Sequence, residues 1–485
     1  MGTLNHNKIL LIHPLGYHPV SAGKDISRIA NIMPPLGLAG ISAYLKQEGI
    51  ESTIVDCYAH PDSLSVIREL LITEKPAAMG LSCTTSSFLD GIKIAEMGKR
   101  IVPDLCIIFG GPHVSAMKER TLLSFPVIDF AIIGEGEETL TDLIRSGFEA
   151  SMSLKGVVFR DRGGEIHFTG HRDGGLNLDS LPFPAYEKLA GFPKTYTLPI
   201  FNYPKSPNTS CISSRGCPYA CNYCDRSVFR KSFRFNSAEY IYEHLRYLKR
   251  RFNIRHVNFY DDLFTFNRKR VEAFTKMVID RPLGITFNCA ARAEHVDGEL
   301  LKQMKAAGCW MISLGIETGD ALLLARHRSH ANLERLAETI NVIKEAGIRT
   351  KGLLMMGLPG ETLDSIQKSR EFVFSLPIDD INLSKFTPFP GSPVYEQIHE
   401  YGAFTENWEK MDCMHFVFIP RGMTKDILEK EFTAFYKSHF LQLRVLLGYA
   451  AMLWRSPDSW IRFVRHLPDF IRFAKSDRRM GDHEK

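Results

Sequence analysis

Three cysteines lie close together in the run SSRGCPYACNYCDR and have the spacing C-x-x-x-C-x-x-C: Cys217, Cys221 and Cys224. One short loop with this spacing can hold three thiolates around one corner of an iron–sulfur cube. Because the cube has four irons, three protein ligands leave one iron open to a small molecule. A structural zinc site usually takes two thiols from one loop and two ligands from elsewhere, which closes its coordination shell. The loop therefore favours a 4Fe-4S cluster over a zinc site or three ordinary buried thiols.

Residues that could hold a small molecule at the open iron follow this loop along the chain. An open iron can chelate the amine and carboxylate of an amino acid, and one electron passed into a sulfonium bound there can break a carbon–sulfur bond. Asp261 and Asp262 could accept hydrogen bonds from an ammonium group or a ribose, and Arg292 could pair with a carboxylate. Glu317 and a glycine-rich run, GLLMMGLPGE, follow. Each feature alone is as often an ordinary loop or ion pair, but their order after the cysteine loop predicts a binding site.

The segment from residue 207 to 395 must position these residues. It alternates six apolar runs with helical patterns, which predicts a partial parallel barrel of the (β/α)6 TIM type. Such barrels build their sites at the C-terminal ends of the strands, which is where the cysteine loop and the charged residues stand. The predicted strands are Ser210–Ser213, His256–Tyr260, Thr286–Ala290, Met311–Leu314, Gly352–Met356 and Ile381–Phe386.

Residues 1–150 predict a second α/β unit, a doubly wound (Rossmann-like) parallel sheet. Ligands bind beyond the carboxyl ends of the strands in such sheets. Ser/Thr residues and glycines stand at these ends, and glycines let a bulky ligand approach the backbone. No G-x-G-x-x-G follows the first strand, so the pattern predicts a ligand domain without a dinucleotide fingerprint; glycines that serve only tight turns are the simpler alternative. The predicted strands are Lys8–His13, Ser52–Val55, Ala78–Ser82, Cys106–Phe109 and Phe130–Ile133.

Two further segments complete the predicted organisation. Residues 151–206 predict a connector with a hairpin between Gly156–Arg160 and Glu165–Thr169. Residues 396–485 predict a helical C-terminal domain, in which the stretch 437–475 carries seven Lys or Arg against two Asp among aromatic and aliphatic residues. An amphipathic cap on the barrel is one interpretation of this stretch, and an interfacial helix that rests on a membrane or grips a lipid is the other.

The composition of the chain excludes several classes of protein. The 485 residues carry a formal net charge of only +5, which does not indicate a nucleic-acid partner. Ten cysteines are too sparse for a disulfide framework and favour a reducing, cytoplasmic location. The N-terminal sequence predicts no signal peptide, and no apolar run is long enough to span a bilayer.

The motifs closely resemble those of radical S-adenosylmethionine (SAM) enzymes that carry an N-terminal cobalamin-binding domain. The matching runs are MPPLGLAGISAYLKQEG, GGPHVS, IIGEGEETL, SSRGCPYACNYC, FYDDLFTF, AARAEHVDGELLKQMKAAGC, SLGIETG, GLLMMGLPGET and TPFPGSPVY. The resemblance implies that Cys217, Cys221 and Cys224 ligate the cluster. It implies that SAM is held by Tyr223, Asp261, Asp262, Arg292, Glu317 and Gly357, with Tyr223 and Gly357 beside the adenine. It places Thr84, Ser86, Gly110, Gly111, Gly134 and Glu135 around cobalamin.

One motif of the broader cobalamin-binding pattern is absent. The sequence D-x-H-x-x-G, which supplies an axial histidine in other cobalamin proteins, does not occur. His13 and His18 lie nearby in sequence, but neither stands in that motif. Many members of the subfamily that the chain resembles also lack this motif, so the lower axial ligand of cobalamin stays unassigned.

The resemblance implies a cobalamin-dependent radical methyltransferase that acts on an unactivated carbon. A radical oxidative cyclase or rearrangement enzyme of the same architecture is the alternative. A non-catalytic cobalamin or cluster sensor is disfavoured by the complete set of motifs. A methylthiotransferase that modifies tRNA is disfavoured because the chain has no second cysteine set and no basic RNA-binding tail.

The remaining expectations concern partners and two other cysteines. The substrate is expected to be a small or lipid-like molecule, and an external one-electron reductant of the flavodoxin or ferredoxin type is expected to supply the electron. Cys413, in MDCMHF, could serve as a second hydrogen-atom or proton donor, although a buried thiol is the simpler interpretation. Cys211 is expected to pack in the barrel core.

Overall fold

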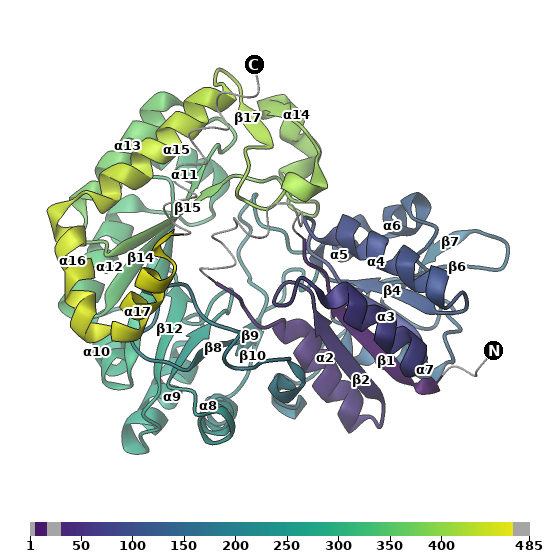
Figure 1. Ribbon diagram of the computed structural model, residues 1–485. Coiled ribbons are helices and arrows are strands. Elements are labelled where there is room, and N and C mark those ends of the chain that lie inside the picture. The colour runs from purple at the N-terminus through teal and green to yellow at the C-terminus, as the bar shows by residue number, and fades with distance from the viewer. Residues whose placement is uncertain (1–4, 17–30, 469–485) are drawn as a thin grey trace.

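Two mainly parallel sheets form the framework of the chain, and their C-terminal strand ends lie toward the space between them (Figure 1). The computed structural model describes residues 5–16 and 31–468. In the described part of the chain no helix is long and apolar enough to cross a bilayer.

The N-terminal sheet has the strand order β2-β1-β3-β4-β5 in its parallel part. The order reverses between β1 and β3, and such a switch point is where doubly wound sheets bind ligands. Successive residues of β1 enter different cores: Ile9 and Leu11 pack on one face of the sheet, and Leu10 and Ile12 pack on the other. The strands are β1 (Asn5–His13), β2 (Glu51–Asp56), β3 (Pro76–Ser82), β4 (Cys106–Gly110) and β5 (Phe130–Ile132). The helices are α2 (Leu36–Gln47), α3 (Ser63–Thr73), α4 (Phe88–Ile101), α5 (Pro112–Met117), α6 (Glu119–Ser124) and α7 (Glu137–Arg145).

The predicted hairpin forms, but it does not stand apart from the N-terminal sheet. Its strands β6 (Val157–Arg160) and β7 (Ile166–Phe168) are antiparallel, and β6 pairs with β5, so the sheet has seven strands. The hairpin thus extends the N-terminal sheet, and the predicted domain boundaries at residues 150 and 206 stay predictions. Val157 and Val158 are fully buried, which explains why they pair with the sheet rather than face solvent.

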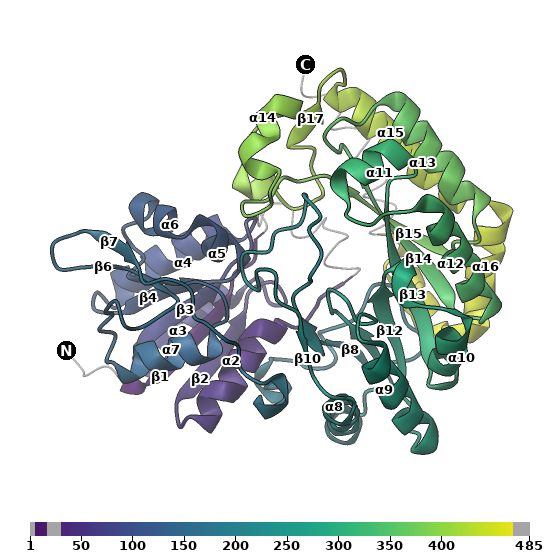
Figure 2. The same cartoon turned by 180° about the vertical axis from the view of Figure 1, so that it is seen from behind.

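The second sheet has six parallel strands in chain order, β8-β11-β12-β13-β14-β15. It curls without closing, and its helices cover the outer face (Figures 1 and 2). This is the predicted partial barrel. Its strands are β8 (Asn208–Cys211), β11 (His256–Phe259), β12 (Thr286–Ala291), β13 (Cys309–Glu317), β14 (Arg349–Met356) and β15 (Asp380–Lys385).

Polar caps set the beginnings of the barrel helices. The side chains of Ser237, Asn267 and Asp297 each accept a hydrogen bond from a backbone N–H in the first turn of the helix that follows. Thr362 and Ser365 form a reciprocal capping box. The helices are α8 (Ala238–Phe252), α9 (Arg268–Asp280), α10 (Gly298–Ala306), α11 (Ala321–His327), α12 (Leu333–Glu345) and α13 (Leu363–Ser375).

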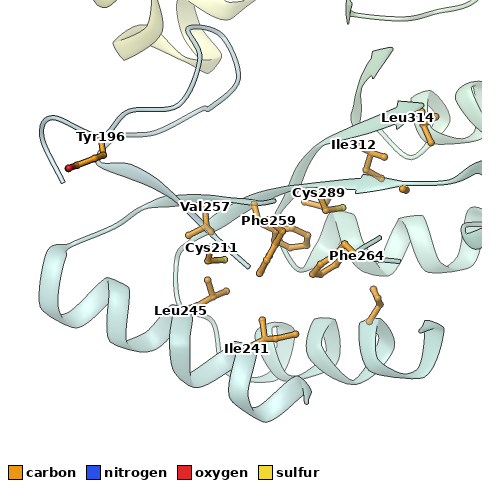
Figure 3. Packing of buried hydrophobic residues seen from close by; sticks show 14 of the residues in the cluster. Tyr196, Cys211, Ile241, Leu245, Val257, Phe259, Phe264, Cys289, Ile312 and Leu314 are labelled. Atoms are coloured by element: carbon orange, nitrogen blue, oxygen red, sulfur yellow. The ribbon is translucent and has the colours of Figure 1, made fainter. Parts of the chain in front are cut away.

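The barrel core lies between the first strands and the helices that cover them. Ile241 and Leu245 of α8 point toward Val257 and Phe259 of β11 (Figure 3). Cys211 is 1% exposed in this cluster, which confirms that it packs in the core. The core fixes the end of β8, from which the cysteine loop departs.

The C-terminal region is helical, as predicted. A small hairpin, β16 (Gly402–Phe404) and β17 (Phe418–Pro420), and the short α14 (Ile398–Tyr401) precede its three main helices. Leu428 and Phe435 of α15 (Lys425–Phe440) are buried, and Tyr436 Oη both donates to the carbonyl of Leu383 and accepts from its N–H. Two further helices, α16 (Leu443–Arg455) and α17 (Pro457–Arg465), complete the fold.

Candidate active site

A cavity of about 610 Å³ lies between the N-terminal sheet and the barrel. One wall consists of strand-end residues of the sheet, among them Gly110, Gly111 and Gly134, and the other consists of the cysteine loop with Tyr260 and Asp262. Figure 2 shows how the loop between β8 and β10 (Arg234–Phe235) occupies the space between the two units. The two regions that the sequence assigned to different ligands therefore face one space.

The cysteine loop is closed at its base by a two-stranded ribbon, β9 (Ser214–Arg215) and β10 (Arg234–Phe235). Cys217, Cys221 and Cys224 all line the cavity. The Cys224 thiol is hydrogen-bonded to the Cys221 sulfur, which lowers the pKa of Cys221 to about 5, and Arg292 acts in the same direction. Burial raises the pKa of the Cys217 thiol, and the hydrogen bond with Cys221 raises that of Cys224. The fit to a cluster therefore rests on position: three thiols of one loop face the same cavity, and iron would bind them as thiolates.

Arg292 is fixed beside these thiols. Its guanidinium carbon lies 3.8 Å from the centre of the Tyr219 ring, and its Nη2 donates to the carbonyl of Ser329 at 2.7 Å. Its Nε pairs with Glu294 at 3.2 Å. The arginine thus has a defined orientation, and its positive charge stabilises the Cys221 thiolate.

Glu317 interacts with Cys221 and, like Arg292 and Tyr223, is not among the residues that line the cavity. It is the last residue of β13 and has a left-handed φ of +63°, which is uncommon for a residue with a side chain. Burial raises the pKa of its carboxyl to about 6, while the charge of Arg328 opposes that rise. Glu317 interacts electrostatically with Cys221 and also with Tyr223. The structure therefore gathers three of the residues predicted to hold SAM around Cys221: Tyr223, Arg292 and Glu317.

Gly357 and Cys413 lie at the next two strand ends. Gly357 follows β14 with φ +92°, and its N–H donates to the buried carboxyl of Glu361, whose pKa burial raises to about 8. The carbonyl of Cys413 accepts a hydrogen bond from Lys385 at the end of β15, at 3.0 Å. Burial raises the pKa of the Cys413 thiol to about 11. Neither residue is among those that line the cavity.

Asp261 and Asp262 have different surroundings. The buried carboxylate of Asp261 accepts from the backbone N–H of Ser213 at 2.6 Å and of Ser214 at 3.1 Å, and from the Ser213 hydroxyl. Arg270 Nη2 lies 3.8 Å from the same carboxylate. Asp261 therefore fixes the base of the cysteine loop, and both of its carboxylate oxygens already accept hydrogen bonds from Ser213 or Ser214. Asp262 lines the cavity instead.

Four of the six residues predicted around cobalamin line the cavity, and two do not. Gly110, Gly111, Gly134 and Glu135 line the cavity, whereas Thr84 and Ser86 do not. Thr84 belongs to a turn in which its N–H donates to Ser87 Oγ at 2.9 Å. Its predicted contact with cobalamin, and that of Ser86, stay predictions. His13 Nδ1 pairs with Asp56 at 2.9 Å, and His18 lies outside the described residues.

A charged network links the two walls of the cavity. Arg215, two residues before the first cysteine of the loop, pairs with Glu135 and, at 2.6 Å, with Glu137. Arg234 on the neighbouring strand also pairs with Glu135. The Glu137 side chain is only 6% exposed, so its charge depends on Arg215. The sequence prediction missed Arg215, Glu137 and the small residues Gly37 and Gly40 of α2, which share the cavity wall. The spacing of these two glycines, one helical turn apart at the start of a helix, was the available signal.

Gly216 gives a direct test of how tightly this loop is held. It has φ +84°, and a Cβ there would lie 2.2 Å from the carbonyl oxygen of Ser232, which stands in the same loop just before β10. We expect Gly216→Ala to reduce bound iron to a small fraction of the wild-type content, because the loop must open to admit the methyl group. Iron per chain and thermal unfolding measure the effect.

The matched control is Gly422→Ala. Gly422 has the same φ of +84° with no atom within 4 Å of the added Cβ, so this variant carries only the left-handed strain of about 1 kcal/mol. Equal iron content in both variants would contradict a closely packed loop.

Comparisons with known proteins agree with this geometry. Residues 211–373 match the radical SAM superfamily model and residues 25–144 match the B12 binding domain model, inside the predicted ranges 207–395 and 1–150. An uncharacterized methyltransferase, PH0819, of Pyrococcus horikoshii is 28% identical over 91% of this chain and 94% of its own length. The anaerobic magnesium-protoporphyrin IX monomethyl ester cyclase of Rubrivivax gelatinosus is 24% identical over 90% of this chain and 77% of its own.

The fold is also that of a solved structure. The radical SAM methyltransferase TsrM of Kitasatospora setae, solved with cobalamin and a [4Fe-4S] cluster, superposes with a TM-score of 0.65 at 17% identity, over 81% of this chain and 75% of that chain. A B12-binding domain binds cobalamin, and a radical SAM domain uses an iron–sulfur cluster and SAM, so these are the cofactors of this chain. The chain is an enzyme of the radical SAM superfamily that carries an N-terminal B12-binding domain.

Proposed function

We propose that this enzyme is a cobalamin-dependent C-methyltransferase that acts on an unactivated carbon of a small-molecule substrate. The shared cavity carries the proposal, because the cluster cysteines and the strand-end glycines of the B12-binding domain line the same space. When bound, the cluster supplies the electron that cleaves SAM, and cobalamin supplies the carrier of the methyl group. A substrate in the cavity would lie within reach of both.

The protein residues have positioning roles in this proposal. Cys217, Cys221 and Cys224 ligate the cluster, and Arg292 keeps its orientation through Ser329 and Tyr219 so that it can pair with the carboxylate of SAM. Asp262 lines the cavity, where its carboxyl can accept hydrogen bonds from hydroxyl groups. Burial and the charge of Asp261 both raise the pKa of this carboxyl, and a hydrogen bond from the Gly216 backbone lowers it.

The nucleoside part of SAM has a second set of partners. Tyr223 and Glu317 lie together beside Cys221. Gly357 stands at the next strand end, where the Phe416 ring lies 3.2 Å from the position that a Cβ would take. Gly110, Gly111, Gly134 and Glu135 form the cobalamin side of the cavity in the proposal, with apolar residues of α2 such as Leu36 and Ile41 on the same wall.

A radical oxidative cyclase is the second candidate. The relative from Rubrivivax gelatinosus is named a cyclase, and it matches 90% of this chain. The two functions use the same cavity and differ in the fate of the substrate carbon.

Product mass separates the candidates. A strain that lacks this enzyme should accumulate the substrate, and we expect the anaerobically reconstituted holoenzyme to convert it into a product about 14 Da heavier, the mass of one CH2 unit. A product with an unchanged carbon count would favour the cyclase, and failure to form 5′-deoxyadenosine would revive a non-catalytic sensor.

Cys413 stays a prediction as a hydrogen donor. Its thiol is half-buried and interacts with Thr387 beyond the end of β15. If it donates, Cys413→Ala should lower product formation at least about tenfold, while SAM cleavage continues and 5′-deoxyadenosine is released without product. Full turnover in the variant would remove Cys413 from the mechanism.

An external one-electron reductant of the flavodoxin or ferredoxin type completes the proposal. Arg230 and Lys231 are exposed a few residues after Cys224 and would attract an acidic donor protein toward the cluster. The cytoplasmic location and the lipid-like nature of the substrate both stay predictions.

A further inference from the structure

The last two helices expose an unusual concentration of apolar side chains. Nine of the 23 exposed large apolar residues in the described part of the chain lie between positions 441 and 467. Trp454 is 81% exposed, Leu441 is 72% exposed and Leu443 is 70% exposed. We define the C-terminal apolar face as Leu441, Leu443, Leu446, Leu447, Leu453, Trp454, Ile461, Val464 and Leu467.

The apolar residues of α16 form one stripe. Leu443, Leu446, Leu447, Leu453 and Trp454 follow the spacing i, i+3, i+4, i+10 and i+11, which places them along one side of a helix. Val445 and Met452 are buried and pack toward the protein from another side. Packing on the barrel thus uses a minor part of the helix, and the larger apolar side faces outward.

The helix pair is firmly attached, so the exposure does not result from a loose end. Ser456, between the two helices, donates to the carbonyl of Tyr203 at 2.5 Å, and Ser459 Oγ accepts from Phe201 N–H at 3.2 Å. Trp460 Nε1 donates to the carbonyl of Tyr449 and ties α17 to α16. In both views α16 lies at the edge of the barrel away from the N-terminal sheet (Figures 1 and 2), and α17 packs beside it.

Lys437, Arg455 and Arg465 are exposed cations on the segment that carries this face, whereas Arg444 and Arg462 donate to the carbonyls of Leu376 and Leu198. Residues 437–467 carry five Lys or Arg and one acidic residue, Asp458. Asp458 accepts a hydrogen bond from the backbone N–H of Ser206, so its charge is turned toward the barrel. Arg455 and Arg465 are exposed at the ends of the two helices.

We propose that the C-terminal apolar face docks on an anionic lipid bilayer, with α16 and α17 in the interfacial plane. An apolar stripe edged by Lys and Arg, with an exposed Trp beside an Arg, matches the lipid–water boundary. A second copy of the chain fits less well, because a two-fold interface places a patch against itself and would oppose like charges. The proposal extends the predicted membrane contact and rests on no step of the proposed methyl transfer.

Vesicle binding tests this proposal without turnover. The full-length holoenzyme is mixed with vesicles of phosphatidylcholine alone or of an equimolar mixture with phosphatidylglycerol, and the bound fraction is measured by flotation. We expect binding to the anionic vesicles at least about tenfold tighter than to neutral ones, weakened by high salt. The double variant Leu447→Asp/Trp454→Asp should lose at least about tenfold of this affinity.

A matched double variant controls for added charge. Ile72 and Leu123 on the N-terminal sheet domain are 60% and 66% exposed, comparable with Leu447 at 61%, so Ile72→Asp/Leu123→Asp should bind vesicles more like the wild type. Both double variants should form 5′-deoxyadenosine at the wild-type rate in solution, which separates docking from catalysis. The proposal is overturned if the wild type does not bind anionic vesicles, if both double variants bind equally, or if Leu447→Asp/Trp454→Asp instead dissociates a dimer in sedimentation.

Discussion

Cys221→Ala is expected to reduce 5′-deoxyadenosine formation by at least about a thousandfold, which corresponds to ~4 kcal/mol of lost transition-state stabilisation. Cys221 is the most buried of the three loop thiols, and its pKa is the one that its neighbours lower. Alanine removes one of three ligands from a single loop, and two thiolates cannot hold a cube that needs three. The same loss is expected for Cys217→Ala and Cys224→Ala. Iron content, the visible absorption of the cluster and 5′-deoxyadenosine yield measure the effect.

Cys106→Ala is the control for this series. Cys106 is a partly buried thiol on β4, outside the cysteine loop, and burial raises the pKa of its thiol above the usual range. The variant should keep iron and activity close to wild type. If Cys221→Ala retained the cluster while Cys106→Ala lost it, the ligand assignment would be wrong.

Arg215→Ala is expected to lower the free energy of unfolding by about 3 kcal/mol, because it leaves the buried carboxylate of Glu137 without its cation. Glu135 would also lose one of its two arginines. Since Arg215 joins the cysteine loop to the B12-binding domain, we expect weaker cobalamin retention together with the lost stability. Denaturant unfolding and equilibrium dialysis against cobalamin measure the two effects.

A surface ion pair provides the comparison. Arg145 pairs with Glu48 at 2.6 Å, but its side chain is 56% exposed, so Arg145→Ala should cost less than about 1 kcal/mol. A double-mutant cycle of Arg215→Ala with Glu137→Ala should show a coupling energy of more than about 1 kcal/mol. Additive effects, or equal losses for Arg215→Ala and Arg145→Ala, would contradict a network that couples the two domains.

The sequence predicted the framework of this enzyme well, because strong periodic signals and polar caps mark its elements. The six barrel strands occur in the predicted order, and helices lie between them where helical patterns were expected. Apolar runs that continue on both faces are typical of buried parallel strands, and this is the pattern of β3, in which Pro76 to Leu81 are all buried.

The pairing of the 157–168 hairpin could not be predicted in the same way. A hairpin signal is local, whereas the contact of Val158 with Ala131 joins residues that are far apart in the chain. The short helices α5 and α6, of six residues each, carry too little periodicity to stand out.

The candidate site likewise contains residues that the sequence could predict and residues that it could not. Residue type and order predicted Cys221, Arg292 and Glu317, which the structure brings together. Order along the chain could not distinguish Asp261 from Asp262, because neighbouring residues at a strand end point in different directions. The partners of Glu135 and Arg215 come from different domains, so their pairing depends on tertiary structure that no local pattern encodes.

The most direct test of methyl transfer follows the methyl group itself. The reduced holoenzyme is given SAM with a trideuterated methyl group and the substrate that accumulates without the enzyme, and the product and 5′-deoxyadenosine are measured together. A C-methyltransferase built on the shared cavity predicts a trideuteromethyl group on the product, with 5′-deoxyadenosine formed alongside it. A product that carries no deuterium and no added carbon, while 5′-deoxyadenosine still forms, would contradict methyl transfer.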